Sequence, residues 1–251
     1  MLREAKPLAA TWRNNYLGDS MSFNVGNWIF SYELEQMERY LDLLHTAISD
    51  NKKQFDSSIE KIANTMTDAE KAEFYEFHED DFSEVSRDFP RLLFSSFVVS
   101  WYSFIENRLI GFCKIHNLKI TLSIQDNENY GEGIRRAYNF LDRAAGYKID
   151  NVHWQELTRI GKTRNSIVHN NGRLTFFPID VSNNTIPVNV LDGMILYLQI
   201  DEDLYRYFQT HNLLEYTGLF YITPNYDYCK HLVKFGLEFF EKLHKDFSKE
   251  A

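Results

Sequence analysis

The chain has 251 residues, 44% of them hydrophobic and 16% aromatic, so it can bury a large core, and general disorder is excluded. The formal net charge of −9 excludes a protein that coats nucleic acid through bulk positive charge. Two cysteines are too few for a disulfide-braced secreted scaffold, and the N-terminal residues resemble no export signal, so a cytoplasmic protein is expected.

The first third of the chain is expected to be helical after an irregular lead-in over residues 1–27. Apolar residues at spacings of three and four predict a long helix from Trp28 to about Asn64, with a break near Asp50-Asn51 as one alternative. Thr67 and Glu70 have the spacing of a capping box, which predicts a short acidic helix from Thr67 to about Asp80.

The longest apolar segment follows Asp88-Phe89-Pro90, where a capping residue and a proline predict the start of a central helix that ends near His116. This segment is shorter than the run of about 20 apolar residues that crosses a bilayer, so no membrane association is expected. Small polar residues form one stripe along the helix: Ser96, Ser100, Ser103 and Asn107. Glu106 lies close to the stripe, either as an interior polar anchor or as a supporting site residue.

Two further helices are predicted after a loop over residues 118–131. The first covers residues 132–145 and ends at Gly146. Asp150 or Asn151 caps the second, whose apolar periodicity continues to the stop signal Asn170-Asn171-Gly172.

The pattern then changes to short alternating segments. Residues 174–179 and 186–200 are predicted strands joined around Ser182-Asn183-Asn184 in a small antiparallel hairpin or sheet. A helix over residues 201–212, a short strand at Phe220–Ile222 and a terminal helix from Pro224 to about Phe247 complete the prediction. The expected fold class is therefore mainly α with a small antiparallel β insertion.

One cluster of polar residues stands out, at the end of the predicted helix that stops at Asn170. The run Arg164-Asn165-Ser166-Ile167-Val168-His169 resembles the motif of the HEPN family, in which Arg and a polar residue precede His by a few mainly apolar positions. Arg164, Asn165 and His169 match that motif. The resemblance covers about residues 88–172 and implies an up-and-down helical bundle over residues 88–251, with the β insertion at about 173–222 and residues 1–87 as a helical extension.

The resemblance also implies a homodimer. On an ideal helix at about 100° per residue, Asn165 and His169 share one face while Arg164 lies about 140° away from His169. In the family, two copies of this helix meet across a dimer, and the cleft between them collects both sets of side chains. The expected activity is metal-independent endoribonuclease cleavage to a 2′,3′-cyclic phosphate, in a toxin–antitoxin or antiviral (phage) defence setting.

The residue types of the motif suit this reaction. The two His169 side chains would act as general base and general acid, since histidine titrates near neutrality. Arg164 would stabilise the crowded phosphorane, and Asn165 would hold an imidazole or a phosphate oxygen.

A basic segment surrounds the motif: residues 157–179 contain no acidic residue. We expect RNA contacts from Arg159, Lys162, Arg173 and Asn170. No cofactor is predicted, and the expected partners are RNA, a second copy of the chain, and an antitoxin or other protein.

The same residues are also compatible with a purely structural role. Arg164 could form a structural salt bridge, and His169 could stabilise the carboxyl end of a helix, where cations are favoured. The chain would then be a non-catalytic, dimeric HEPN-fold adaptor protein that uses its additions to bind a partner.

Metal binding has weak support in the sequence. Cys113 with His116, and Cys229 with His231, lack the repeated pairs of structural zinc sites, and core packing of both cysteines is favoured. The remaining histidines have no partner that spacing reveals: His45, His78, His153, His211 and His244. No metal site is predicted.

Overall fold

The computed structural model describes residues 25–115, 131–180, 185–190 and 193–247. The predicted loop at 118–131, except residue 131, and the turn at 182–184 lie outside these residues. So do residues 1–24 of the lead-in predicted over 1–27, whereas residues 25–27 are helical, because the first long helix begins at Val25. The protein is mainly helical with small antiparallel sheets, as predicted. No helix within the described ranges is long and apolar enough to cross a membrane.

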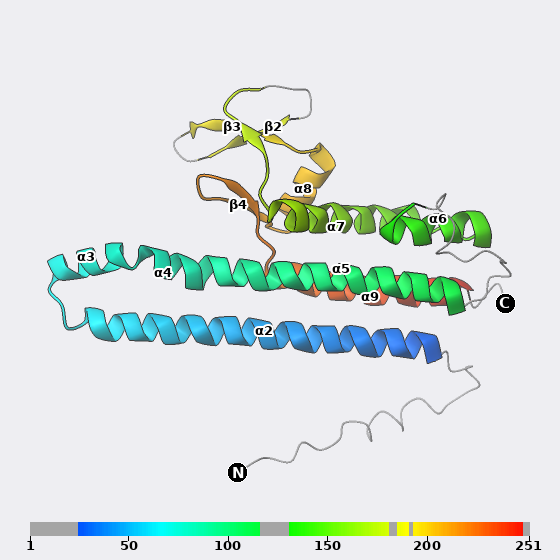
Figure 1. Ribbon diagram of the computed structural model, residues 1–251, viewed down its shortest axis with the longest axis horizontal. Coiled ribbons are helices and arrows are strands. Elements are labelled where there is room, and N and C mark those ends of the chain that lie inside the picture. Colours follow the sequence, from blue (N-terminus) through cyan, green and yellow to red (C-terminus); the bar gives the residue numbers. More distant parts are fainter. Residues whose placement is uncertain (1–24, 116–130, 181–184, 191–192, 248–251) are drawn as a thin grey trace, which may run out of the picture.

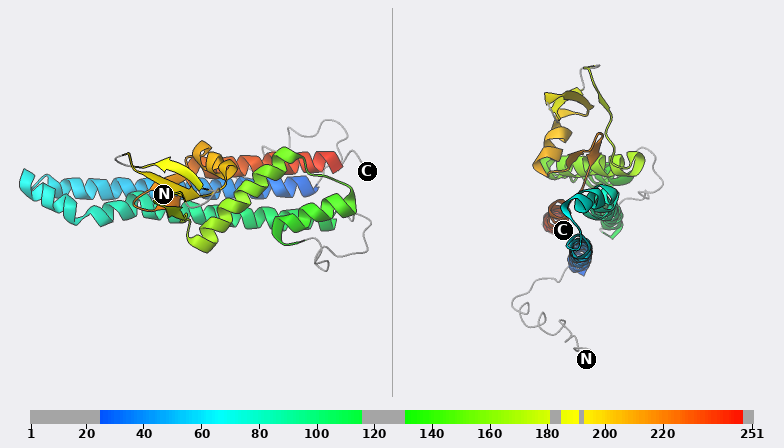
Figure 2. Two further views of the ribbon diagram at one scale, coloured as in Figure 1. Left: turned by 90° about the horizontal axis from the view of Figure 1, so that it is seen from above. Right: turned by 90° about the vertical axis from the view of Figure 1, so that its left-hand side faces the viewer.

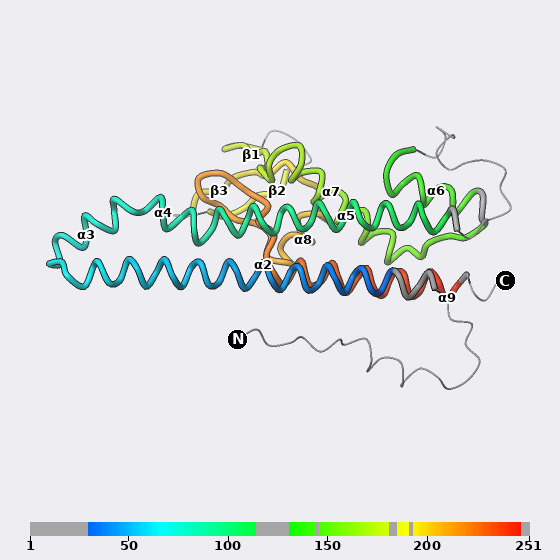
Figure 3. The backbone as a smooth tube through the Cα atoms, turned by 60° about the horizontal axis from the view of Figure 1, so that its bottom comes forward, coloured from blue at the N-terminus to red at the C-terminus, as the bar shows by residue number. Residues whose placement is uncertain are grey.

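Three long helices lie side by side along the molecule: α2 (Val25–Ala63), α5 (Phe89–Ile115) and α9 (Tyr226–Phe247) (Figure 1). The tube in Figure 3 shows α9 running beside the first half of α2. On the side of α5 that faces away from α2 lie α6 (Gly133–Ala145) and α7 (Asn151–Asn170), and α7 crosses the long helices obliquely (Figure 2). One of two small β sheets lies beyond α7, on the outermost side of the molecule, and the other lies beside the end of α7 (Figure 1).

The helix α2 belongs to the main hydrophobic core. Its buried residues Phe30, Leu34 and Leu41 join the same cluster as Trp101 of α5. Phe30 stacks on Phe240 of α9 with a centroid distance of 4.6 Å. The helix continues without interruption to Ala63, so the alternative of a break near residue 50 is wrong. The predicted extension and the predicted bundle therefore share one core.

The segment before α5 differs from the prediction. The capping box at Thr67 is confirmed at the start of α3 (Asp68–Phe77), where the Thr67 backbone N–H donates to Glu70 at 2.8 Å. The chain then continues through α4 (Glu79–Ser83) and a π-helical turn, η1 (Glu84–Asp88), directly into α5. Asp88 is thus a residue of a continuous helical path and not a cap. A wide π turn offers a place for Pro90, which cannot donate a backbone hydrogen bond to the preceding turn.

Both ends of α7 follow the predicted signals. The Asp150 side chain caps the helix by accepting a hydrogen bond from the His153 N–H at 3.1 Å. The helix ends at Asn171, whose backbone is left-handed, and Gly172 follows with a φ of +75°. Gly146, also left-handed, ends α6 as expected.

The β region consists of two small sheets and one helix. The first sheet has the order β1-β3-β2, formed by β1 (Phe176–Phe177), β2 (Thr185–Asn189) and β3 (Ile195–Gln199). Leu198 of the central strand pairs with both Phe176 and Ile186. The predicted hairpin around residues 182–184 is therefore wrong in its pairing, because β1 and β2 each pair with β3.

The predicted helix over 201–212 is confirmed as α8 (Glu202–Thr210). After α8, the strands β4 (Leu214–Tyr216) and β5 (Phe220–Ile222) form a second, two-stranded sheet. The strand at β5 was predicted from the sequence, whereas β4 was not. Gly172 joins this sheet to the end of α7 by accepting a hydrogen bond from the Ile222 N–H at 2.7 Å.

Candidate functional site

The helix α7 turns one face toward the core and leaves the other accessible. Its buried residues are Leu157, Ile160, Gly161, Thr163 and Ile167. Asn165 and His169, one helical turn apart, are both exposed on the opposite side. Among the described residues, no hydrogen bond or ion pair holds the His169 ring, so it is accessible to a ligand.

Arg164 has a more enclosed position. Its guanidinium lies over the ring of Tyr102 on α5, with Cζ 5.7 Å from the ring centroid. One Nη1 hydrogen donates to Oδ1 of Asn165 at 3.0 Å. The Nε atom is buried and has no hydrogen-bond partner within the described part of the chain. The structure therefore joins Arg164 to Asn165 by a hydrogen bond, and His169 lies exposed one turn further along α7.

The predicted RNA-binding residues Arg159 and Lys162 are paired with carboxylates of α8. Arg159 donates to both oxygens of Asp203, at 2.9 and 2.5 Å, and Lys162 donates to Asp201 at 2.8 Å. Hydrogen bonding to Asp203 raises the pKa of Arg159, and the pKa of Asp203 is lowered in turn. The positive charge of the acid-free segment 157–179 is thus partly neutralised by aspartates that follow the segment in the chain.

The remaining cations gather where α7 ends. Arg173 is exposed, and its backbone N–H donates to the carbonyl of the exposed Asn170 at 2.9 Å. Arg91, at the start of α5, donates to the carbonyl of Asn171 at 3.5 Å and lies over the Tyr221 ring at 5.1 Å. Arg91 was not predicted as a site residue, because nothing in the sequence relates it to a segment 80 residues away.

Glu106 is half-buried and lies beside the start of α6. A Cβ built on Gly133, the first residue of α6, would lie 3.7 Å from Oε1 of Glu106. A carboxylate at the amino end of a helix interacts favourably with the helix dipole. Burial raises the pKa of Tyr102, and the charge of Glu106 raises it further, so this carboxylate also lies near the Arg164 environment.

The two cysteines are buried and unpaired by disulfides, and burial raises the pKa of Cys113 to about 12. Sγ of Cys229 lies 3.9 Å from the Phe94 carbonyl, in the core. His116, the proposed partner of Cys113, lies outside the described residues. Cys229 and His231 do not form a site together, because His231 is directed toward a different residue.

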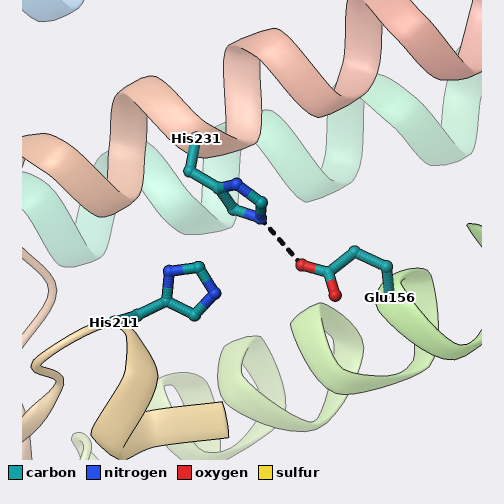
Figure 4. A group of neighbouring side chains, drawn as sticks. All are labelled: Glu156, His211 and His231. Carbon is teal, nitrogen blue, oxygen red and sulfur yellow. Dashed lines mark hydrogen bonds and ion pairs between the residues drawn. The ribbon is translucent and has the colours of Figure 1, made fainter.

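A second cluster of polar residues, Glu156, His211 and His231, lies where α7, the end of α8 and α9 meet (Figure 4). Each residue offers one ligand atom, and these atoms lie within 4.8 Å of one another. His231 Nε2 is 2.8 Å from Oε1 of Glu156, and the ring of His211 points toward the space between them. All three side chains are half-buried.

Two tyrosines and an arginine surround this cluster. The Tyr207 hydroxyl donates to Oε1 of Glu156 at 2.9 Å and lies 3.3 Å from the Tyr228 hydroxyl. Nη1 of Arg159 lies 3.8 Å from Oε2 of Glu156. The Glu156 carboxylate therefore receives interactions from three sides.

These contacts set the charges of the cluster. Burial tends to raise the pKa of Glu156, but hydrogen bonds from His231 and Tyr207 and the nearby imidazoles lower it overall. Burial lowers the pKa of His211, and the neighbouring His231 lowers it further. Burial also raises the pKa of Tyr207 far above its usual range. At neutral pH the cluster thus contains a carboxylate beside a neutral His211.

Sequence reasoning missed this cluster. Glu156 and His231 are 75 residues apart, and His211 follows a helix that lies between them in the chain. The sequence indicated only that each residue lies on or beside a predicted helix. It does not indicate which helices pack together, so no rule based on sequence spacing could identify these three residues as a group.

Comparison of the chain with protein-family models, with curated proteins and with solved structures found no match in any of the three.

Proposed function

We propose that this protein is a metal-independent endoribonuclease of HEPN type that acts as a homodimer in the cytoplasm. The observation that carries the proposal is the arrangement at the end of α7. Arg164 is hydrogen-bonded to Asn165, and the exposed His169 follows one turn later. The toxin–antitoxin or phage-defence setting is part of the proposal and comes from the resemblance of the motif alone.

The exposed ring of His169 is suited to proton transfer. In a dimer, one His169 would remove the proton of the ribose 2′-hydroxyl while the other protonates the leaving 5′-oxygen. The 2′-oxygen then attacks the phosphorus, the bond to the 5′-oxygen breaks, and the products are a 2′,3′-cyclic phosphate and a 5′-hydroxyl. Arg164 would stabilise the negative charge of the phosphorane, using donors that the Asn165 contact leaves free.

Apolar side chains beside the motif support self-association. Val168 on α7 and Leu92 on α5 expose 46% and 51% of their surface. The contact between Arg91 and the Asn171 carbonyl brings the start of α5 to the end of α7, so these two side chains lie at the same end of the helix pair. Exposed apolar residues next to polar functional groups are typical of protein interfaces.

A second candidate function is a non-catalytic adaptor with the same dimeric scaffold. The observation that favours it is that the cations in and just before the motif already have partners within the monomer. Arg159 and Lys162 are bound to Asp203 and Asp201, and Arg164 is stacked on Tyr102. In this case the β region would bind a protein partner.

The test is RNA cleavage in EDTA by the full chain. Wild type, His169→Ala and the control His45→Ala are compared on single-stranded and structured RNA, with DNA of the same sequence. We expect His169→Ala to lower the cleavage rate about 10²–10⁴-fold and His45→Ala, which replaces another exposed histidine, to retain activity. Products should carry 2′,3′-cyclic phosphates, and DNA should remain intact.

The oligomeric state separates the two candidates. A dimer in sedimentation experiments together with His169-dependent cleavage supports the nuclease. A dimer with no cleavage, or with equal cleavage by wild type and His169→Ala, rules out the proposed site and leaves the adaptor. A monomer that does not cleave contradicts both.

A further inference from the structure

We propose that Glu156, His211 and His231 form a binding site for a divalent transition-metal ion of the zinc class. The three potential ligands come from α7, the end of α8 and α9, and their side chains converge on one space (Figure 4). This inference concerns residues outside the Arg164–His169 motif and does not rest on the proposed nuclease activity.

The spacing of the ligand atoms is close to that of a metal centre. In a tetrahedral zinc site with bonds of about 2.0–2.1 Å, neighbouring ligand atoms lie about 3.3 Å apart. His231 Nε2 and Glu156 Oε1 are 2.8 Å apart, and the largest separation in the group is within 4.8 Å. Bringing the most distant pair of ligand atoms to the tetrahedral spacing requires a side-chain displacement of at most about 1.5 Å.

The position of His211 distinguishes the cluster from an ordinary salt bridge. Glu156 and His231 form a hydrogen bond with each other. In the described part of the chain, however, no hydrogen bond involves a ring nitrogen of His211. Its ring instead lies 4.5 Å from the His231 ring and 4.6 Å from the Tyr207 ring. Enclosed polar groups usually have partners, and a shared metal ion would supply one to this imidazole.

The backbone around His211 is held in place. Its N–H donates to the Tyr207 carbonyl at 3.2 Å, and its own carbonyl accepts from the Asn225 side chain at 3.1 Å. Asn225 also accepts a hydrogen bond from the Tyr228 N–H at 2.8 Å, at the start of α9. One side chain thus ties the end of α8 to the helix that carries His231, which fixes two of the ligands relative to each other.

The surrounding residues act as an outer shell. Metal-binding carboxylates are commonly hydrogen-bonded by a second residue that orients them. Tyr207 provides that bond to Oε1 of Glu156, and Arg159 lies 3.8 Å from Oε2. A bound ion would take the place of the hydrogen bond between Nε2 of His231 and Oε1 of Glu156.

The ligand types select the class of metal. Imidazole nitrogens favour zinc, cobalt, nickel or iron, whereas magnesium and calcium prefer oxygen ligands alone. Two histidines and one glutamate leave a coordination position for water, as in catalytic and not in closed structural zinc sites. The group is not sealed in the core, because all three side chains are half-buried and that of His231 is 35% exposed.

The experiment uses the full chain, stripped with EDTA and then freed of chelator. Cobalt(II) is titrated and its visible absorption followed, and zinc is then added as a competitor. We expect one cobalt per chain, an intense spectrum typical of four- or five-coordinate cobalt, and displacement by zinc. Zinc should also raise the thermal unfolding temperature, since it binds the folded state.

Three variants assign the site. His211→Asn and Glu156→Gln each remove one ligand and should lower cobalt affinity more than tenfold. Tyr207→Phe keeps all three ligands and should lower it about 10-fold through the outer shell. The matched control is His78→Ala, because His78 forms a similar histidine–carboxylate pair with Asp81 at 2.6 Å but belongs to no group of three ligands in the part of the chain that the structure describes. This control should bind as wild type.

The outcomes separate clearly. Circular dichroism and metal-free unfolding temperatures show which variants are folded, and Glu156→Gln is a nearly isosteric replacement chosen for that reason. No cobalt binding by wild type, or unchanged binding by a folded His211→Asn, overturns the site. RNA cleavage is measured in EDTA, so a failure of the nuclease proposal leaves this result untouched, and the reverse also holds.

Discussion

The guanidinium of Arg164 lies over the ring of Tyr102, and Gly161 creates the space that Tyr102 occupies. A Cβ on Gly161 would lie 3.0 Å from the Tyr102 hydroxyl oxygen and 3.3 Å from Cε2. The guanidinium carbon of Arg164 is 5.7 Å from the centroid of the same ring. The contact between α5 and α7 therefore positions the arginine of the motif through a glycine one turn earlier.

A double-mutant cycle tests this contact. Replacing a helical glycine by alanine ordinarily stabilises a helix by about 1 kcal/mol, but here the new methyl group presses on Tyr102. We expect Gly161→Ala to be more favourable in a Tyr102→Phe background, by about 0.5–1 kcal/mol in the free energy of unfolding. Urea denaturation of the four proteins measures it. If the effects of the two substitutions on the free energy of unfolding are strictly additive, the Tyr102 hydroxyl does not restrict residue 161.

Gly172 is required by the end of α7. It has a φ of +75°, and a Cβ there would lie 2.9 Å from the Ile222 carbonyl oxygen, which is backbone and cannot rotate away. Gly172→Ala should lower the free energy of unfolding by about 1–3 kcal/mol. The control is Gly218→Ala, because Gly218 has a φ of +83° and no atom within 4 Å of the new Cβ. Equal losses in the two variants would mean that the contact with β5 adds nothing.

Removal of the Asp203 carboxylate should leave Arg159 with the longer contact to Glu156, at 3.8 Å, as its ion pair within the described residues. The pair is largely exposed on the Asp203 side, at 59%, so Asp203→Asn should change the free energy of unfolding by less than about 1 kcal/mol. If α7 binds RNA, the guanidinium without its closest carboxylate tightens binding and makes the salt dependence steeper by about one unit of log–log slope.

The control for that experiment removes an equal charge elsewhere. Glu73 is exposed on α3, at the far end of the long helices (Figure 1), and Glu73→Gln should leave RNA affinity nearly unchanged. Filter binding at several salt concentrations compares the variants. An equal gain from both substitutions would show that net charge, and not Arg159, is responsible.

The lowered pKa of Asp150 should make the stability of the protein depend on pH. Burial tends to raise the pKa of Asp150, but bonds from the His153 backbone and ring, together with Lys242, lower it below the usual 3.8. A group with a lowered folded-state pKa stabilises the protein above its unfolded pKa, and this contribution is lost as the pH falls through the folded value. The window therefore begins near pH 3.8 and extends downward.

Asp150→Asn isolates this contribution, since asparagine can still cap α7. The difference in stability between wild type and variant should be largest at neutral pH and shrink as the pH falls below about 3.8. Denaturant unfolding between neutral and acidic pH, with chelator present, measures it. A difference that stays constant with pH would contradict the assignment.

Much of the helical architecture could be predicted because its signals are local. The box at Thr67–Glu70, the cap at Asp150 and the stop at Asn171-Gly172 each act within one helical turn. Asp88 misled the prediction for a related reason. It is a good capping residue before a proline, but the π turn at Glu84–Asp88 lets the helical path continue through it. The pairing of β1 with β3 was also beyond local rules, because pairing joins segments that are separated in the chain.

The candidate site divides in the same way. Arg164, Asn165 and His169 could be placed in the last turns of one helix from the sequence, because periodicity and a stop signal are local features. The pairing of Arg159 and Lys162 with carboxylates at the start of α8, and the convergence of Glu156, His211 and His231, became evident only from the folded chain. Helix ends depend on neighbouring backbone groups, whereas ion pairs and metal ligands depend on which faces of distant helices are buried together.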